Sequence, residues 1–325
     1  MGSVNRKNIF ITGAAGFIGF HLASRLQAIG HHVIGYDNFN AYYNPALKRR
    51  RALMLEAEGI KIVEGDICDM PLLQQCIEKH QTTHLIHLAA QAGVRYSIDN
   101  PQAYVKANLE GFVNILESCR RNVDMKLIYA SSSSVYGLNE KVPFAESDRT
   151  DHQASLYGAT KKTNELLAGV YHHLYGIPVT GLRFFTVYGP WGRPDMAYFS
   201  FTQAILAGKP IDVFNEGELL RDFTYIDDII DGTAAAIELG AKCEIFNLGH
   251  HQPVKLLDFI ATLEETLGRK AIMRYRPMQA GDVIKTYAEI THSAEKLQFA
   301  PKISLKEGLA RFVAWRQQCN NDEIF

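Results

Sequence analysis

Tyr157 and Lys161 have the types and spacing needed for proton transfer. They stand four residues apart in a segment whose pattern predicts a helix over 156–175, so both side chains lie on one face. A neighbouring ammonium group favours the phenolate and lowers a tyrosine pKa that is ordinarily about 10. A phenolate near neutral pH is a general base for the proton of an alcohol. The pair alone is a weak signal, and its meaning depends on its surroundings.

A run of four serines, Ser131 to Ser134, follows a predicted strand over 126–130. Hydroxyls at this place can hydrogen-bond the oxygen that a tyrosine deprotonates. An ordinary polar loop after a strand has the same composition, and the sequence does not show which serine takes this place. Ser132, Ser133 and Ser134 are all candidates.

A glycine-rich turn lies between a predicted strand over 8–12 and a predicted helix over 17–28. Glycines in this position allow a tight turn and close approach of the backbone to a pyrophosphate at the helix N-terminus. The spacing differs by one residue from the common G-x-G-x-x-G form, and an ordinary strand-to-helix turn is the alternative. The predicted dinucleotide contacts in this turn are Gly13, Ala15, Gly16, Phe17, Ile18 and Gly19.

Other candidate contacts with a dinucleotide follow the next predicted strands. Asp37 stands where an acid hydrogen-bonds the adenosine ribose and repels a 2′-phosphate, which favours NAD over NADP. Ligands of this architecture bind at the carboxyl ends of the strands. The further predicted cofactor contacts at those ends are Asn38, Asp66, Ile67, Leu88, Ala89, Ala90 and Gln91.

Short apolar runs alternate with helical patterns through the first half of the chain. This alternation predicts parallel βαβ units and a Rossmann-type, doubly wound α/β fold. The regular alternation of strands and helices ends after residue 185, where shorter elements predict a smaller α/β domain. We expect a NAD-binding domain over 1–185 and a mainly nucleotide-sugar-binding domain over 186–325, with a soft boundary and segments crossing back.

Composition narrows the class of protein. The chain has 325 residues, 47% of them hydrophobic, and a formal net charge of −1 with no basic tract. Nucleic acid and membrane surfaces are therefore not expected partners. Five scattered cysteines without C-x-x-C spacing, and no candidate membrane span, favour the cytoplasm. The three His-His pairs lack acidic or cysteine partners at ligand spacing, so no metal site is expected.

Longer strings carry a family resemblance over nearly the whole chain. The glycine turn, the Tyr157/Lys161 pair and the segment 221–228 resemble extended short-chain dehydrogenases/reductases that act on nucleotide sugars. The segments 88–97 and 185–196 resemble UDP-glucuronate 4-epimerases more narrowly. The resemblance implies an isomerase that uses NAD to convert UDP-glucuronate to UDP-galacturonate through a transient 4-keto sugar, returning the hydride to the opposite sugar face.

The resemblance also implies residue roles. Tyr157 takes the proton of the sugar 4-hydroxyl, Lys161 holds the nicotinamide ribose and keeps Tyr157 ionised, and Ser132 hydrogen-bonds the same oxygen. Asn108 is placed with the cofactor contacts, as a support for the active-site helix. Related dehydratases and decarboxylases carry acids where this chain has Ser133 and Ser134, which favours plain epimerisation.

The expected substrate contacts are Arg95, Thr186, Arg193, Arg221 and Asp282. The resemblance places Arg221 on the diphosphate and Asp282 on the nucleotide ribose. We hypothesise that Thr186 and Arg193 clamp the sugar carboxylate, since arginine offers a planar two-donor fork. A water-facing loop arginine is the alternative for Arg193.

Three competing interpretations remain at this point. A UDP-glucose 4-epimerase or a UDP-glucuronate decarboxylase would have the same fold, and an NAD-binding regulatory relative would have no activity. A homodimer is expected from the resemblance, through the helices predicted over 103–121 and 156–175. Leu116, Leu167 and Val170 could face the partner or belong to the core.

Overall fold

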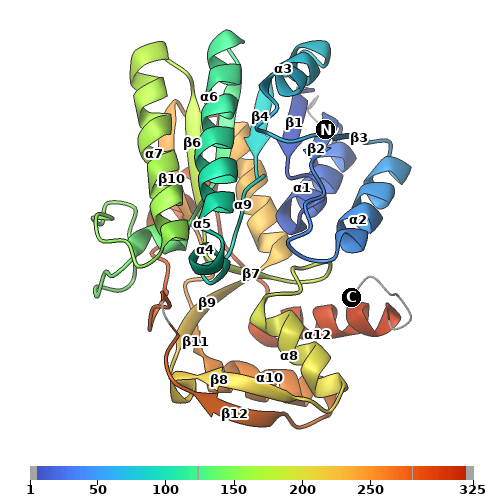
Figure 1. The fold of residues 1–325 in the computed structure, drawn as a ribbon, viewed down its shortest axis with the longest axis vertical. Coiled ribbons are helices and arrows are strands. Elements are labelled where there is room, and N and C mark those ends of the chain that lie inside the picture. The colour runs from blue at the N-terminus through green and yellow to red at the C-terminus, as the bar shows by residue number, and fades with distance from the viewer. Residues whose placement is uncertain (1–5, 123, 280, 320–325) are drawn as a thin grey trace.

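A seven-stranded sheet forms the centre of the computed structural model, which describes residues 6–122, 124–279 and 281–319 (Figure 1). The strands follow the order β10-β6-β5-β4-β1-β2-β3 and pair in parallel throughout. The predicted doubly wound α/β fold is therefore confirmed. Its elements up to residue 184 are β1 (Asn8–Thr12), α1 (Phe17–Ala28), β2 (His32–Asp37), α2 (Pro45–Ala57), β3 (Lys61–Glu64), α3 (Met70–Lys79), β4 (His84–His87), α4 (Tyr96–Asp99), α5 (Pro101–Tyr104), η1 (Val105–Glu110), α6 (Gly111–Arg121), β5 (Lys126–Ser132), η2 (Ser133–Tyr136), α7 (Leu156–Tyr175) and β6 (Val179–Phe184).

The central strands are apolar on both faces because helices cover both. Along β1, Ile9 and Ile11 enter the core beneath α1, whereas Phe10 enters a second core beneath α3, α6 and α7. In β4, Ile86 likewise packs into the core beneath α1, and Leu85 packs into the second core. Continuous aliphatic runs are the expected composition of such doubly covered parallel strands.

Helix α7 begins and ends at residues suited to its termini. The Ser155 side chain accepts a hydrogen bond from the Gly158 amide at 3.1 Å, which caps the first turn. At the other end, Gly176 adopts a left-handed conformation with φ of 70°. The cap fixes the first turn of α7, and this turn carries Tyr157.

The single helix predicted over 103–121 is three consecutive segments, α5, η1 and α6. The middle one, η1, is a π-helical turn that contains Asn108. A π turn adds a residue to the helix and changes the direction of the side chains that follow. Periodicity predicts the helix but does not reveal this insertion.

The rest of the chain builds a smaller lobe beneath the sheet in Figure 1. It contains a three-stranded sheet, β11-β9-β7, and a two-stranded sheet, β12-β8. Sequence analysis missed these strands because most are short and half exposed. The elements are β7 (Thr186–Tyr188), α8 (Ala197–Leu206), β8 (Pro210–Phe214), η3 (Asn215–Gly217), β9 (Leu220–Tyr225), α9 (Ile226–Leu239), β10 (Cys243–Leu248), β11 (Pro253–Lys255), α10 (Leu256–Leu267), β12 (Ile272–Arg276), α11 (Thr291–Leu297) and α12 (Leu305–Gln318).

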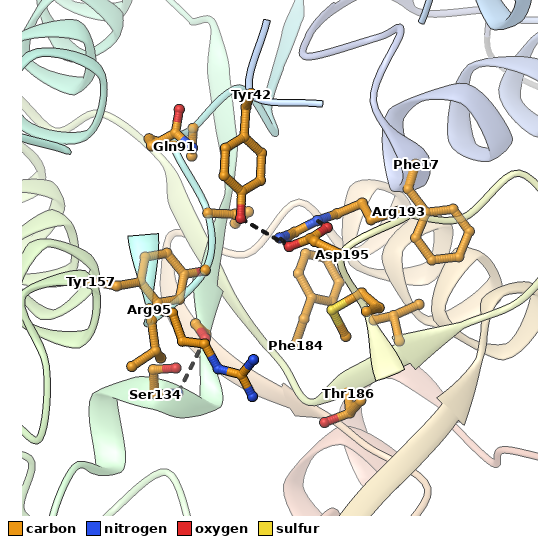
Figure 2. A pocket seen from close by; sticks show the side chains of 18 of the residues that line it. Phe17, Tyr42, Gln91, Arg95, Ser134, Tyr157, Phe184, Thr186, Arg193 and Asp195 are labelled. Carbon is orange, nitrogen blue, oxygen red and sulfur yellow. Dashed lines mark hydrogen bonds and ion pairs between the residues drawn. The ribbon is translucent and has the colours of Figure 1, made fainter. Parts of the chain in front are cut away.

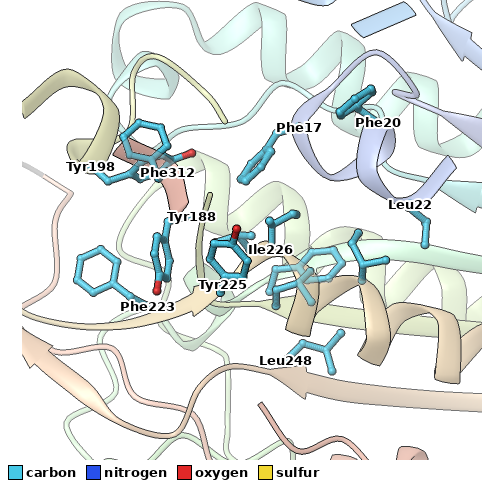
Figure 3. Packing of buried hydrophobic residues seen from close by; sticks show 14 of the residues in the cluster. Phe17, Phe20, Leu22, Tyr188, Tyr198, Phe223, Tyr225, Ile226, Leu248 and Phe312 are labelled. Atoms are coloured by element: carbon cyan, nitrogen blue, oxygen red, sulfur yellow. The ribbon is translucent and has the colours of Figure 1, made fainter. Parts of the chain in front are cut away.

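The chain crosses back from this lobe into the large sheet. Strand β10 pairs with β6 at the sheet edge, and α9 packs against α1. One hydrophobic core continues across both parts, as Figure 3 shows where Phe17 of α1 lies toward Tyr225 and Ile226. The aromatic residues Tyr188, Tyr198 and Phe312 extend this core into the smaller lobe. The ends of the predicted domains, at 1–5 and 320–325, lie outside the described residues.

Of the three residues considered for a partner contact, two pack inward. Leu116 is fully buried and Leu167 packs against the same core, beneath α6 and α7. Val170 is 50% exposed. Within the ranges described above, no helix is both long and apolar enough to cross a membrane.

Candidate active site

A cleft of about 1030 Å³ lies between the carboxyl ends of the large sheet and the smaller lobe. Residues from both parts line it (Figure 2). Its volume lies at the upper end of the range for small-molecule sites, about 300–1,000 Å³. All predicted site residues except Ala15 and Asn108 line this one cleft.

Tyr157 and Ser132 come together on one wall of the cleft. Ser132 ends β5, and its side chain also accepts a hydrogen bond from the Ser134 amide at 3.1 Å. Burial raises the pKa of Tyr157, whereas a hydrogen bond with Ser132 and the positive charge of Arg193 lower it. The structure therefore selects Ser132 from the serine run as the hydroxyl that contacts the tyrosine.

Lys161 follows Tyr157 by one turn of α7 and is buried. Its ammonium group donates to the carbonyl oxygen of Ala130 at 2.8 Å. Burial lowers the pKa of Lys161 to about 8. That Lys161 lowers the pKa of Tyr157 stays a prediction; the positive charge that lowers this pKa in the structure is that of Arg193.

The glycine turn forms a cradle with no room for side chains. A Cβ on Gly13 would lie 2.6 Å from the amide nitrogen of Ala89, and one on Gly19 would lie 2.1 Å from the Gly13 carbonyl oxygen. Gly13 also has φ of 74°, which favours glycine. Helix α1 starts directly after this turn and has no acidic residue in its first turn. The cradle and the free helix N-terminus fit a dinucleotide pyrophosphate.

Asp37 is buried at the end of β2, close to the glycine turn. One carboxylate oxygen accepts from the Ala15 amide at 3.1 Å and the other from the Phe39 amide at 2.9 Å. A carboxylate has about four acceptor positions, so both oxygens keep capacity for ribose hydroxyls. Asp66 is likewise oriented, by the Asn38 side chain at 2.9 Å and the Cys68 amide at 2.9 Å.

Ala15 and Asn108, predicted as cofactor contacts, lie behind the wall of the cleft. Ala15 is fully buried and holds Asp37 through its amide. The Asn108 side chain accepts from the Gln91 amide at 2.8 Å and donates to the Gln91 carbonyl and to Thr160, each at 3.0 Å. Asn108 thereby joins the loop after β4 to α7, which agrees with the predicted support of that helix.

Two cations on the buried face of α2 were missed by sequence analysis. Lys48 lines the cleft, donates to the Asn40 side chain at 2.9 Å and lies near Asp37. Arg51 is fully buried and donates to the carbonyl oxygens of Ala15, Trp191 and Gly192. Arg51 therefore ties the glycine turn to the loop that carries Arg193. The available signal was two cations three residues apart on an otherwise apolar helix face.

The smaller lobe brings Arg221 and Asp282 together. Arg221 in β9 forms an ion pair with Asp282 at 3.2 Å and donates to two backbone carbonyls, those of Leu220 and Ile284. Thr186, at the start of β7, lines the same cleft. Arg95 comes from the large sheet's side and stacks over the Phe214 ring at 5.1 Å, so it spans both parts.

Arg193 lines the cleft and is partly buried. Its Nε and Nη2 donate to the two carboxylate oxygens of Asp195, at 3.1 and 2.5 Å, and Tyr42 donates to Asp195 at 3.0 Å. Figure 2 shows this group across the cleft from Tyr157. Sequence analysis predicted Arg193 but not its two neighbours.

The described part of the chain contains no group of three or more His, Cys, Asp or Glu side chains that could hold a metal ion. The backbone amides of His250 and His251 donate to the Asp222 carboxylate, at 2.8 and 3.1 Å, and orient it.

Comparison with known proteins identifies the family. The NAD dependent epimerase/dehydratase family matches residues 9–249. The chain belongs to this family. It is 50% identical to UDP-glucuronate 4-epimerase 4 of Arabidopsis thaliana over 96% of this chain and 75% of that protein.

Solved structures of family members show the same fold. The UDP-glucuronic acid 4-epimerase of Bacillus cereus, in complex with UDP-glucuronic acid and NAD, superposes with a TM-score of 0.89 at 37% identity, covering 95% of this chain and 99% of that one. A UDP-glucose 4-epimerase of Thermotoga maritima gives 0.89 at 31% identity, covering 96% and 99%. Ser133 and Ser134 both line the cleft of this family member.

Proposed function

We propose that this protein is an NAD-dependent isomerase that interconverts UDP-glucuronate and UDP-galacturonate by inversion at C4. The observation that carries the proposal is a cleft in which Tyr157 and Ser132 lie on one wall and the cation Arg193 lies across from them, beside a dinucleotide cradle. Bound NAD supplies the acceptor for the hydrogen of C4 and the source from which it returns to the other sugar face. About 50% identity to plant UDP-glucuronate 4-epimerases supports this assignment.

The proton of the 4-hydroxyl is handled by three residues. Tyr157 takes it and later gives it back, while Ser132 hydrogen-bonds the same oxygen and keeps it in line with the phenol. Lys161 holds the nicotinamide ribose and contributes positive charge on the same helix. Ser133 and Ser134 contribute hydroxyls to the wall without adding an acid or base.

The two nucleotides are held at opposite ends of the cleft. Gly13, Gly16 and the start of α1 hold the pyrophosphate of NAD, and Asp37 holds its adenosine ribose. An acid at this place disfavours a 2′-phosphate. In the smaller lobe, Arg221 binds the diphosphate of the sugar nucleotide and Asp282 its ribose, each already oriented by the other.

The carboxylate of the sugar lies next to the reacting carbon, since C6 is attached to C5 and C5 to C4. A residue that binds it must therefore be close to Tyr157. Arg193 meets this condition, because its charge acts on the Tyr157 phenol. We propose that Arg193, with Thr186, fixes the carboxylate. Holding the C5–C6 bond out of alignment with the C4 carbonyl suppresses loss of CO2 from the β-keto acid.

Replacing Arg193 by glutamine is expected to weaken the use of UDP-glucuronate and to increase a decarboxylated pentose by-product. Loss of a charge-assisted contact of about 1.5–3 kcal/mol corresponds to about 10–100-fold in kcat/KM. Product analysis by chromatography and initial rates measure both effects. Unchanged kinetics without additional pentose would contradict the carboxylate clamp.

The proposed function is tested by supplying UDP-glucuronate, UDP-glucose and UDP-xylose separately and identifying the products. Formation of UDP-galacturonate from the first supports it. A UDP-glucose 4-epimerase would prefer the second, a decarboxylase would release CO2 from the first, and an NAD-binding regulatory protein would convert none. Each of these three results would refute the proposal.

We also propose a homodimer that pairs α6 and α7 with their copies. These helices lie side by side at one edge of the molecule (Figure 1). On α7, Leu166, Val170 and Leu174 follow at four-residue spacing and are 59%, 50% and 59% exposed. Such a stripe lies on one helix face and favours burial against a second copy.

Replacing Leu166 and Val170 by glutamate is expected to convert a dimer to a monomer without unfolding it, because both side chains point out of the core. Sedimentation velocity measures the change, and circular dichroism checks the fold. An identical replacement of Leu239, 44% exposed on α9, is the control. A wild-type monomer at micromolar concentration would refute the dimer.

We place the protein in the cytoplasm. Four of the five cysteines, Cys68, Cys76, Cys119 and Cys243, are free thiols in the structure. Unpaired cysteines are typical of a reducing compartment. Fractionation of the native cell tests this placement.

A further inference from the structure

Arg193, Asp195 and Tyr42 form a cluster in which the arginine is only partly used. Asp195 engages the edge of the guanidinium formed by Nε and Nη2. A guanidinium carries five N–H donors, so one carboxylate on this edge leaves the Nη1 edge available. Neither of the two hydrogen bonds to Asp195 involves Nη1. The arginine can therefore bind a second planar anion while it keeps the first.

Asp195 is itself held from a separate part of the chain. Tyr42, in the loop after β2, donates to the same Asp195 oxygen that accepts from Nη2, and its ring lies 5.9 Å from the guanidinium carbon. A Cβ on Gly93 would lie 3.0 Å from the Tyr42 hydroxyl and 3.6 Å from Nη2 of Arg193. The cluster thus fills a space bounded by three loops, which restricts rotation of Arg193.

The charges of the cluster are settled by its contacts. Burial opposes ionisation of Asp195, but the charge and hydrogen bonds of Arg193 and the Tyr42 hydroxyl outweigh it and hold the pKa of Asp195 below its ordinary value. Burial and the adjacent Asp195 raise the pKa of Tyr42 to about 12, so its phenol remains a donor. The side chains of Arg193 and Asp195 are 22% and 31% exposed, on the cleft side.

We infer that Asp195 and Tyr42 are positioning residues that hold Arg193 with its Nη1 edge toward the sugar carboxylate, and so set the ratio of epimerisation to decarboxylation. The inference rests on the proposed function. An arginine without this support would still attract a carboxylate, but it would not fix the rotation of the C5–C6 bond. Orientation is the part of binding that controls which bond breaks.

The side reaction, decarboxylation of the 4-keto intermediate, needs no additional oxidant or reductant. In the 4-keto intermediate the C5–C6 bond breaks, its electron pair passes into the C4 carbonyl, and CO2 leaves. One proton is then taken up at C5 to give the 4-keto pentose. The ratio of this pentose to UDP-galacturonate therefore reports how well the carboxylate is held.

The test compares wild type with Asp195→Asn, Asp195→Glu and Tyr42→Phe, using UDP-glucuronate as substrate. We expect Asp195→Asn to raise the pentose-to-galacturonate ratio by about 10-fold, within the range that a misplacement of about 1 Å produces. Tyr42→Phe should shift the ratio in the same direction by less, and Asp195→Glu should restore part of it. Asp231→Asn, which removes an exposed carboxylate paired with Arg25 on the surface, is the control and should leave the ratio unchanged.

A second comparison separates positioning from general damage. If Asp195 acts only through Arg193, then Asp195→Asn added to Arg193→Gln should not change the ratio further. The inference would be overturned if the two substitutions multiplied their effects on the ratio, or if Asp195→Asn left the ratio unchanged. A lower KM for UDP-glucuronate in Asp195→Asn would also overturn it. Thermal melting and bound-nucleotide content confirm that each variant is folded. Wild-type protein that forms no UDP-galacturonate would refute the proposed function itself, whereas an active wild type with an unaffected Asp195→Asn would refute this inference alone.

Discussion

Phenylalanine in place of Tyr157 is expected to reduce turnover of UDP-glucuronate by about 10³-fold, within the range for loss of a general acid–base group. The substitution removes only the phenol oxygen, which contacts Ser132 and lies in the field of Arg193. The remaining ring can keep its edge-to-face contact with Tyr104, at a centroid distance of 6.1 Å. Bound NAD should therefore stay at the wild-type level, measured by absorbance of the nucleotide released on denaturation.

The pH dependence of the wild-type enzyme follows from the same residue. Since burial raises the pKa of Tyr157, the phenolate fraction, and with it the rate, should increase as pH rises toward that pKa. Lys161 acts in the opposite sense, because its pKa of about 8 means that its positive charge is lost as pH rises above this value. Values of kcat/KM measured between pH 6 and 10 show both the rise from Tyr157 and the fall from Lys161.

Tyr171→Phe is a matched control for the tyrosine. Tyr171 lies on the same helix and donates to Glu117 at 2.8 Å, away from the cleft. It should keep wild-type turnover. Retention of more than about a tenth of the activity by Tyr157→Phe would mean that another group takes the proton.

Methionine in place of Arg183 is expected to lower the free energy of unfolding by about 3–5 kcal/mol, as for other buried pairs that lose one partner. Arg183 is buried in β6 and binds both carboxylate oxygens of Glu165, at 2.8 and 2.9 Å. It also donates to the Tyr136 hydroxyl at 2.9 Å. Among the described residues, removing the cation leaves the buried Glu165 carboxylate with only the Ser131 hydroxyl and the more distant Lys162 ammonium, at 3.7 Å, to compensate its charge.

This pair also holds the catalytic groups in place. Glu165 lies two turns after Tyr157 on α7 and accepts from Ser131 at 2.6 Å, directly before Ser132 in β5. The network therefore fixes the helix that carries the tyrosine against the strand that carries the serine. Residual activity of Arg183→Met below its melting temperature should also decrease.

Urea denaturation with and without added Glu165→Leu tests the electrostatic origin of the effect. The double variant should recover part of the lost stability, because it removes the unpaired charge as well. Arg120→Met is the control, since Arg120 also contacts both carboxylate oxygens of Glu117, on the exposed side of α6. Exposed pairs contribute little, so its midpoint should barely move. Equal losses in Arg183→Met and Arg120→Met would refute this account.

Local pattern was sufficient for the central sheet and for the reaction type. The strand Asn8–Thr12 and the helices Phe17–Ala28 and Leu156–Tyr175 have the predicted bounds. Hydrophobic periodicity, the glycine turn and a serine cap are all properties of neighbouring residues, so they can be read along the chain. The four-residue spacing of Tyr157 and Lys161 is likewise a property of one helix.

Contacts between distant segments were decided only by the tertiary structure. Of the three candidate serines, Ser132 is the one that contacts Tyr157, which lies twenty-five positions further along the chain. The Tyr42 contact with Asp195 joins loops after β2 and β7. Strand β10 returns to the first sheet because its apolar residues complete the core beside β6. The spacing of motifs does not predict such contacts, since each depends on how whole elements pack.

The sequence by itself therefore determined the fold class, the glycine turn of the cradle and the tyrosine that we propose moves the proton. The tertiary structure decided that a cation from a distant loop, Arg193 of the smaller lobe, enters the same cleft as that tyrosine. The physical reason is that electrostatic effects depend on distance and burial in space, which the packing of the two lobes sets.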